Sequence, residues 1–114
     1  MANGFLAPLN WLSTITEKLL QEDTFNDMQR NFLMNINKEA KAFQMLVLAT
    51  SDTNDDQSTQ VLSFEGRSHL NNIMGYAEEL IDEVEGELTD EQRDLVFEVR
   101  SSARQLIEML DKMG

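Results

Sequence analysis

Apolar residues recur every three or four positions along this chain, which is the spacing that places them on one side of an α-helix. Four such segments cover nearly the whole sequence, so we predict an all-α protein of the four-helix bundle type. We expect an N-terminal helical pair (residues 1–51), a polar linker (52–58) and an antiparallel helical hairpin (59–114, with its helices within 58–113). Together they form one compact domain.

The first helix of the N-terminal pair is predicted from about Pro8 to Gln21, because proline fits the first turn, where no N–H is needed. The second helix is predicted from about Thr24 to Thr50, with Asp23 or Thr24 as its cap. Its apolar stripe consists of Phe25, Met28, Phe32, Ile36, Ala40, Phe43 and Val47.

The hairpin is predicted to have one helix from about Thr59 to Glu85 and a second that begins after a capping box, Thr89-Asp90-Glu91-Gln92. Its apolar seam, the predicted dimer core, comprises Leu70, Ile73, Ala77, Leu80, Val84, Leu95, Val99 and Leu106. A four-helix core can form in two ways. Either two chains pair their hairpins through this seam, or the N-terminal pair takes the place of the partner's hairpin within a monomer. Because the first helix is short, we expect a homodimer. No internal repeat is evident.

The first hairpin helix also carries a motif. The stretch is Ser63-Phe64-Glu65-Gly66-Arg67-Ser68-His69-Leu70-Asn71-Asn72-Ile73-Met74-Gly75-Tyr76. It resembles the helix of sensor histidine kinases that carries the phosphorylated histidine, usually S-H-E-L-R-T-P-L-N-x-I-x-G-Y. Comparable places in the family's second helix are occupied by Gly86, Leu88, Glu91, Gln92, Val99, Ser102, Leu106 and Ile107.

This resemblance spans residues 58–113, about half of the chain. It implies a dimerisation and histidine-phosphotransfer (DHp, or HisKA-like) domain, which pairs into a four-helix bundle and docks response-regulator receiver domains. Phe64 falls on the phospho-accepting histidine, and a phenyl ring cannot accept a phosphoryl group. The domain is therefore degenerate, and no residue is assigned a catalytic role.

Phe64 lies roughly 150° from the centre of the seam on a helical wheel, so it points away from the core of the hairpin. Either the aromatic residues of the N-terminal pair cover it, or it is an exposed anchor for a partner. His69, the only histidine, replaces the family's proline and flanks the seam, which suits a half-buried structural residue. Gly66 replaces a leucine and is expected to thin the bundle there.

Composition narrows the possible functions. The net charge is -12, with five acidic and four basic residues before position 52 and sixteen and five from there on. This negative charge disfavours binding to nucleic acid, because it repels the phosphates. The chain has no cysteine, no nucleotide-binding glycine motif and no Glu-x-x-His, so no metal and no cofactor are expected. Its apolar runs are too short for a membrane span, and its start lacks a basic n-region, which favours the cytoplasm.

These observations favour a catalytically inert adaptor in two-component signalling. It would bind a response-regulator receiver domain or a sensor histidine kinase through Phe64, Glu65, Arg67, Ser68 and His69. One alternative is a receiver-domain phosphatase, because the resemblance places Glu65 as a general base and Ser68 as a water-positioning residue. Both side chains are also compatible with a plain solvated surface. A third possibility is a bare dimerisation module of a larger signalling protein.

Overall fold

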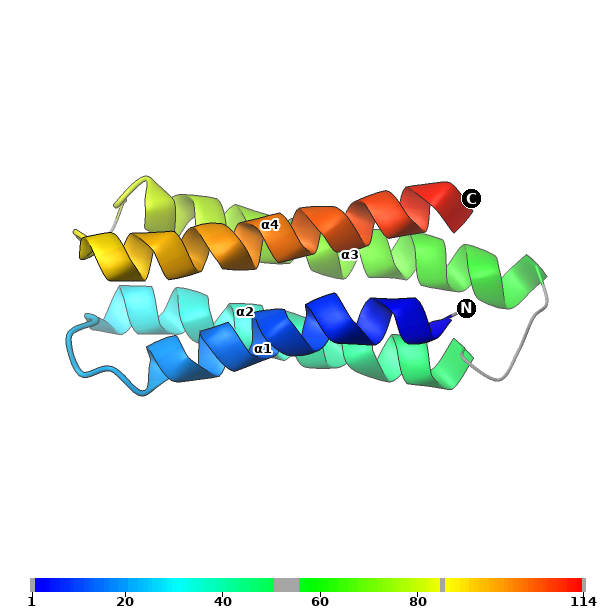
Figure 1. Cartoon of the computed structure of the whole chain (residues 1–114), viewed down its shortest axis with the longest axis horizontal. Coiled ribbons are helices and arrows are strands. Elements are labelled where there is room, and N and C mark those ends of the chain that lie inside the picture. Colours follow the sequence, from blue (N-terminus) through cyan, green and yellow to red (C-terminus); the bar gives the residue numbers. More distant parts are fainter. Residues whose placement is uncertain (1, 51–55, 85, 114) are drawn as a thin grey trace.

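The computed structural model of the chain describes residues 2–50, 56–84 and 86–113, with side chains from Gly4 onward. A short 3-10 turn, η1 (Ala2–Phe5), leads into four α-helices. These are α1 (Leu6–Leu20), α2 (Asp27–Thr50), α3 (Asp56–Ile81) and α4 (Asp90–Met113). They run side by side along the 45 Å axis of the molecule (Figure 1), and the described ranges contain no strand. The predicted all-α bundle is confirmed.

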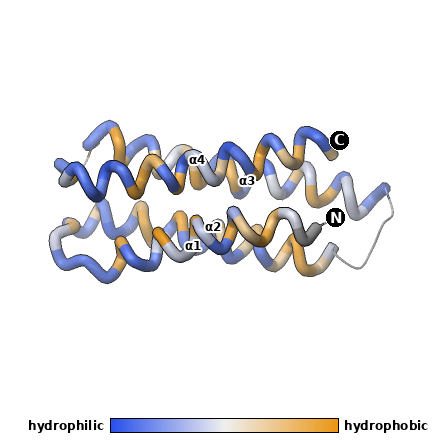
Figure 2. The backbone as a smooth tube through the Cα atoms, viewed as in Figure 1, coloured by the Kyte–Doolittle hydropathy of each residue, from blue (hydrophilic) through white to orange (hydrophobic). Residues whose placement is uncertain are grey.

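Each helix packs mainly on two neighbours. Helix α1 lies against α2 and α4, and α3 lies against the same two helices. The α1–α2 and α3–α4 pairs therefore face each other as two hairpins, with both chain termini at one end (Figure 1). Apolar and polar stretches alternate along each helix (Figure 2), and the buried apolar residues of all four helices form one core.

One chain buries most of the predicted seam by itself. Six of its residues are at most 2% exposed: Leu70, Ile73, Ala77, Leu80, Val99 and Leu106. Helices α1 and α2 supply the opposing surface, which is the monomeric arrangement that the sequence allows. Leu95 is half-buried, whereas Val84 is 61% exposed and lies outside the core because α3 ends at Ile81.

The helix starts agree only in part with prediction. Helix α2 is capped by Asn26, whose Oδ1 accepts the Gln29 N–H at 2.8 Å while Gln29 Oε1 accepts the Asn26 N–H at 3.0 Å. The predicted caps Asp23 and Thr24 are therefore wrong. The Thr89–Gln92 capping box of α4 forms as predicted. Helix α3 begins within the expected linker, so residues 56–58 are helical, and residues 51–55 lie outside the described part.

Helix α3 ends in a cap that the sequence does not predict. The Val84 N–H bonds the Glu79 carbonyl at 3.3 Å and the Glu83 N–H bonds the Leu80 carbonyl at 3.1 Å, the pattern of a Schellman cap. Glu83 occupies the left-handed position with a φ of 56°, where glycine is usual. Its carboxylate accepts the Leu88 N–H at 2.9 Å and pairs with Arg93 at 2.6 Å, which stabilises this conformation.

The two hairpins repeat one pattern of buried positions, although the sequence shows no obvious repeat. Buried residues of α2 and α4 correspond in pairs, with the same difference in residue number for every pair. The pairs are Gln29 and Gln92, Leu33 and Val96, Ile36 and Val99, Ala40 and Ala103, Phe43 and Leu106, and Val47 and Leu110. Buried residues of η1 and α1 correspond to buried residues of α3 in the same way, with a second constant difference in residue number. The pairs are Phe5 and Gly66, Leu9 and Leu70, Leu12 and Ile73, Thr16 and Ala77, and Leu19 and Leu80. The α1–α2 hairpin thus occupies the place that a second α3–α4 hairpin would take in a dimer.

Candidate partner-binding site

Phe64 is the most exposed large apolar side chain of the described residues, at 79%. Helix α3 turns Leu62, Gly66 and Leu70 to the interior, and Phe64 falls on the outward face. The aromatic residues that were candidates to cover it lie in the core instead, namely Phe25, Phe32 and Phe43. Phe64 is therefore exposed, and the interpretation in which the N-terminal helices cover it is wrong.

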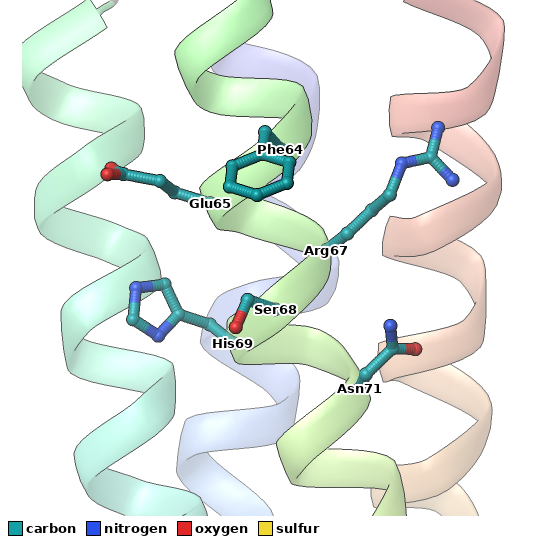
Figure 3. A pocket seen from close by; sticks show the side chains of 6 residues that line it. All are labelled: Phe64, Glu65, Arg67, Ser68, His69 and Asn71. Carbon is teal, nitrogen blue, oxygen red and sulfur yellow. The ribbon is translucent and has the colours of Figure 1, made fainter.

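Phe64 lies at a surface pocket that belongs entirely to α3 (Figure 3). The lining residues are Phe64, Glu65, Arg67, Ser68, His69 and Asn71. All five residues predicted to bind a partner are thus brought together, and Asn71 joins them. Side chains separated by three or four positions share a helix face, which explains why this short stretch forms one continuous surface.

The pocket is tied to α2 on one side. His69 Nδ1 lies 2.6 Å from Glu39 Oε1, and Asn72 Nδ2 donates to Glu39 Oε2 at 3.2 Å. His69 is partly buried between the helices, so the prediction of a half-buried structural histidine agrees with the structure. Sequence reasoning missed Glu39. Its signal was an acid that borders the apolar stripe of α2, beside Ala40.

The other side of the pocket is tied to α4, because Arg67 forms an ion pair with Asp111. In Figure 3, Glu65 and His69 extend toward one neighbouring helix, and Arg67 extends toward the other. Phe64 and Ser68 lie between these two sides, on the outward face. Polar side chains thus lie on both sides of the Phe64 ring. Two of them already contact neighbouring helices, Arg67 through Asp111 of α4 and His69 through Glu39 of α2.

Gly66 lies beneath the pocket, and the expected thinning of the bundle does not occur. A Cβ at Gly66 would lie 2.8 Å from Phe43 Cε1 and 3.0 Å from Leu110 Cδ1. The ring of Phe43 fills the space, and it packs edge-on against Phe5 with 5.9 Å between the ring centroids. Glycine thereby lets α3 lie close to the aromatic core of the N-terminal hairpin.

The pocket contains few side chains that could take part in a reaction. Glu65 and Ser68 are exposed and one helical turn apart, so both can meet the same bound surface. Among the residues that the structure describes, no group of histidine, cysteine or acidic side chains could hold a metal ion. No helix in those ranges is long and apolar enough to cross a membrane.

Comparisons with known protein families, with curated proteins and with solved structures find no match to this chain.

Proposed function

We propose that this chain is a catalytically inert adaptor that binds a response-regulator receiver domain, or a sensor histidine kinase, through the pocket around Phe64. The observation that carries the proposal is the 79% exposure of this phenyl ring where the resembled helix has its phosphorylated histidine. An exposed aromatic residue with charged neighbours is typical of the central residue of a protein interface. Such an adaptor would act by occupancy in the cytoplasm, where its partners lie.

The internal correspondence of the two hairpins supports a single docking site per chain. The α1 positions that correspond to Arg67, Ser68 and His69 are Leu6, Ala7 and Pro8. They carry neither charge nor hydroxyl, so the corresponding face of α1 lacks the chemistry of the pocket. A dimeric kinase bundle has two equivalent docking faces, whereas we expect this chain to bind one receiver domain.

Isothermal titration tests the proposal with a panel from the same genome that contains isolated receiver domains, phosphorylated and unphosphorylated, and sensor histidine kinases. We expect at least one receiver to bind with one-to-one stoichiometry. Phe64→Asp should weaken that binding by more than about tenfold, because truncation of a hot-spot residue at the centre of an interface costs about 2 kcal/mol or more. Trp11→Asp is the matched control, since Trp11 is 51% exposed on α1 and lies outside the pocket.

Circular dichroism should first establish that both variants keep the helical fold. Binding of no receiver and no kinase, or equal weakening by Phe64→Asp and Trp11→Asp, would contradict the proposal.

A receiver-domain phosphatase is the second candidate, and the shared outward exposure of Glu65 and Ser68 favours it. A phosphatase of this kind needs no phosphorylated histidine. It predicts that the chain accelerates loss of phosphate from a phosphorylated receiver and that Ser68→Ala removes the acceleration. The adaptor predicts binding with an unchanged rate of phosphate loss, so one assay separates the two functions.

A further inference from the structure

Helix α2 exposes a face that is separate from the pocket on α3. Its residues, here called the lysine–methionine face, are Asn31, Met34, Lys38, Lys41, Met45 and Leu48. They follow one another at intervals of three or four and so lie along one side of the helix. Met34 is 57% exposed, Met45 is 71% exposed and Leu48 is 53% exposed. Three large apolar side chains therefore project to solvent from a single helix.

The charge of this face is opposite to that of the molecule. The net charge is -12, yet the face carries Lys38 and Lys41 and no acid. The one acid of α2 beyond its first turn is Glu39, which turns toward α3 to contact His69. Neither lysine forms an ion pair with any residue in the described ranges. The face thus combines positive charge with exposed apolar surface.

We propose that the lysine–methionine face binds an acidic amphipathic helix of a partner protein. The apolar ridge of such a helix would pack on Met34, Met45 and Leu48, which lie before and after the lysines along α2. Methionine is flexible and polarisable, and it suits a surface that adapts to a helical ligand. Carboxylates beside the ridge would pair with Lys38 and Lys41, and this complementarity sets the sign of charge that the partner must carry.

Two other occupants fit the face less well. A second copy packed antiparallel about a two-fold axis at the middle of the face would place Lys38 and Lys41 against the same lysines, and like charges repel. An anionic membrane would meet only these two lysines, while the strong negative charge of the rest of the chain opposes its approach. An acidic helix avoids both conflicts, because its carboxylates would pair with Lys38 and Lys41.

The test uses the full chain with 13C-labelled methionine methyl groups and two synthetic helical peptides. Both peptides carry the same leucine ridge, which is flanked by glutamate in one and by lysine in the other. We expect the glutamate peptide to shift the methyl signals of Met34 and Met45, and to leave those of the partly buried Met74 and Met109 in place. The lysine peptide should shift none of them.

Lys38→Glu/Lys41→Glu should weaken binding of the glutamate peptide by roughly tenfold, since it turns two attractions into repulsions. Arg104→Glu/Lys112→Glu is the matched control, because it changes the net charge equally at exposed positions of α4. Equal weakening by both variants, or no shift of Met34 and Met45 with the glutamate peptide, would overturn the proposal.

Two further results would also overturn it by identifying another occupant. One is a dimer of the chain alone in sedimentation that Lys38→Glu/Lys41→Glu dissociates. The other is co-sedimentation with phosphatidylglycerol vesicles that the same variant abolishes, without binding of the glutamate peptide. Neither receiver domains nor the Phe64 pocket enters these measurements, so their outcome is independent of the adaptor function.

Discussion

Gly66 and Gly75 lie on the same helix, α3, in opposite surroundings. A Cβ at Gly66 would press on the buried ring of Phe43, whereas a Cβ at Gly75 would meet nothing within 4 Å. Replacing a helical glycine by alanine stabilises a protein by about 0.4–1 kcal/mol when the side chain fits, and overpacking costs about 1–3 kcal/mol. Substitution of each glycine by alanine therefore distinguishes the effect of backbone entropy, at Gly75, from the effect of overpacking, at Gly66.

We predict that Gly75→Ala raises the free energy of unfolding by about 0.5–1 kcal/mol. Gly66→Ala should lower it by about 1–2 kcal/mol, because Phe43 is wedged against Phe5 and cannot withdraw. Urea denaturation followed by circular dichroism measures both. Equal stabilisation by the two substitutions would show that Phe43 moves aside.

Glu83 gives a prediction about pH. The Leu88 N–H, and then the Arg93 side chain, hold the pKa of Glu83 below its ordinary value of 4.5. A lowered pKa in the folded state means that the carboxylate stabilises the fold above about pH 4.5 and loses this effect as pH falls through the lowered pKa. Glu83→Gln should therefore be less stable than the wild type at neutral pH, and the difference should shrink in acid.

The measurement compares urea midpoints of the wild type and Glu83→Gln at pH 7 and at about pH 3. Glu98→Gln, at an exposed position of α4, controls for the loss of one negative charge. A difference between the wild type and Glu83→Gln that persists unchanged in acid would rule out the charged form as its source.

At the scale of single residues, the sequence predicted the direction of Phe64 but not the environment of Gly66. The direction follows from helix periodicity, which is local. The environment of Gly66 depends on Phe43, which comes from another hairpin and has no fixed relation to Gly66 in the sequence. For the same reason the sequence revealed His69 as partly buried and left its partner Glu39 unidentified.

At the scale of elements, two glutamines join the connections at one end of the bundle. Gln29 caps α2 and donates from Nε2 to the Glu87 carbonyl at 3.2 Å. Gln92 caps α4 and donates from Nε2 to Glu22 at 2.9 Å and to Thr24 at 2.7 Å. Each glutamine thus fixes the start of its own helix and the loop of the opposite hairpin.

Gln92→Ala should lower the free energy of unfolding by about 1–3 kcal/mol, because the buried amide satisfies three polar groups that would lose their partner. Glu91→Ala, on the exposed side of the same turn, should cost only a few tenths of a kcal/mol. Chemical denaturation of both variants measures the contrast. Similar small losses would mean that water replaces the amide without cost.

The internal correspondence explains which helix starts could be predicted. Thr89 is followed three positions later by Gln92, and Asn26 stands in the same relation to Gln29, so both caps have the same form. The first cap could be predicted from the sequence, whereas the second was predicted too early, because Asp23 and Thr24 are also favoured caps. A comparison of Asp27-Met28-Gln29-Arg30 with Asp90-Glu91-Gln92-Arg93 was the available signal for the repeat.

At the scale of the whole molecule, the N-terminal hairpin is specifically complementary to the second one. Phe5 corresponds to Gly66 and Phe43 to Leu106, so the large rings stand where the second hairpin has a glycine and a smaller side chain. The ring of Phe43 fills the space that Gly66 leaves. In a dimer of two α3–α4 hairpins, Leu106 would replace Phe43 and a second glycine would replace Phe5. Such a core would contain cavities, and cavities cost stability.

We therefore predict that the full chain sediments as a monomer of 13.1 kDa, in contrast to the homodimer that the sequence predicts. Analytical ultracentrifugation across a wide range of concentrations tests this prediction. The variant Phe43→Leu tests whether the ring of Phe43 stabilises the packing of the two hairpins within one chain. Phe43→Leu makes the two hairpins more alike and leaves space at Gly66, so it should lower the free energy of unfolding by about 1–3 kcal/mol. A wild-type dimer whose stability rises with concentration would show that the seam, buried here within one chain, opens to pair with a second copy.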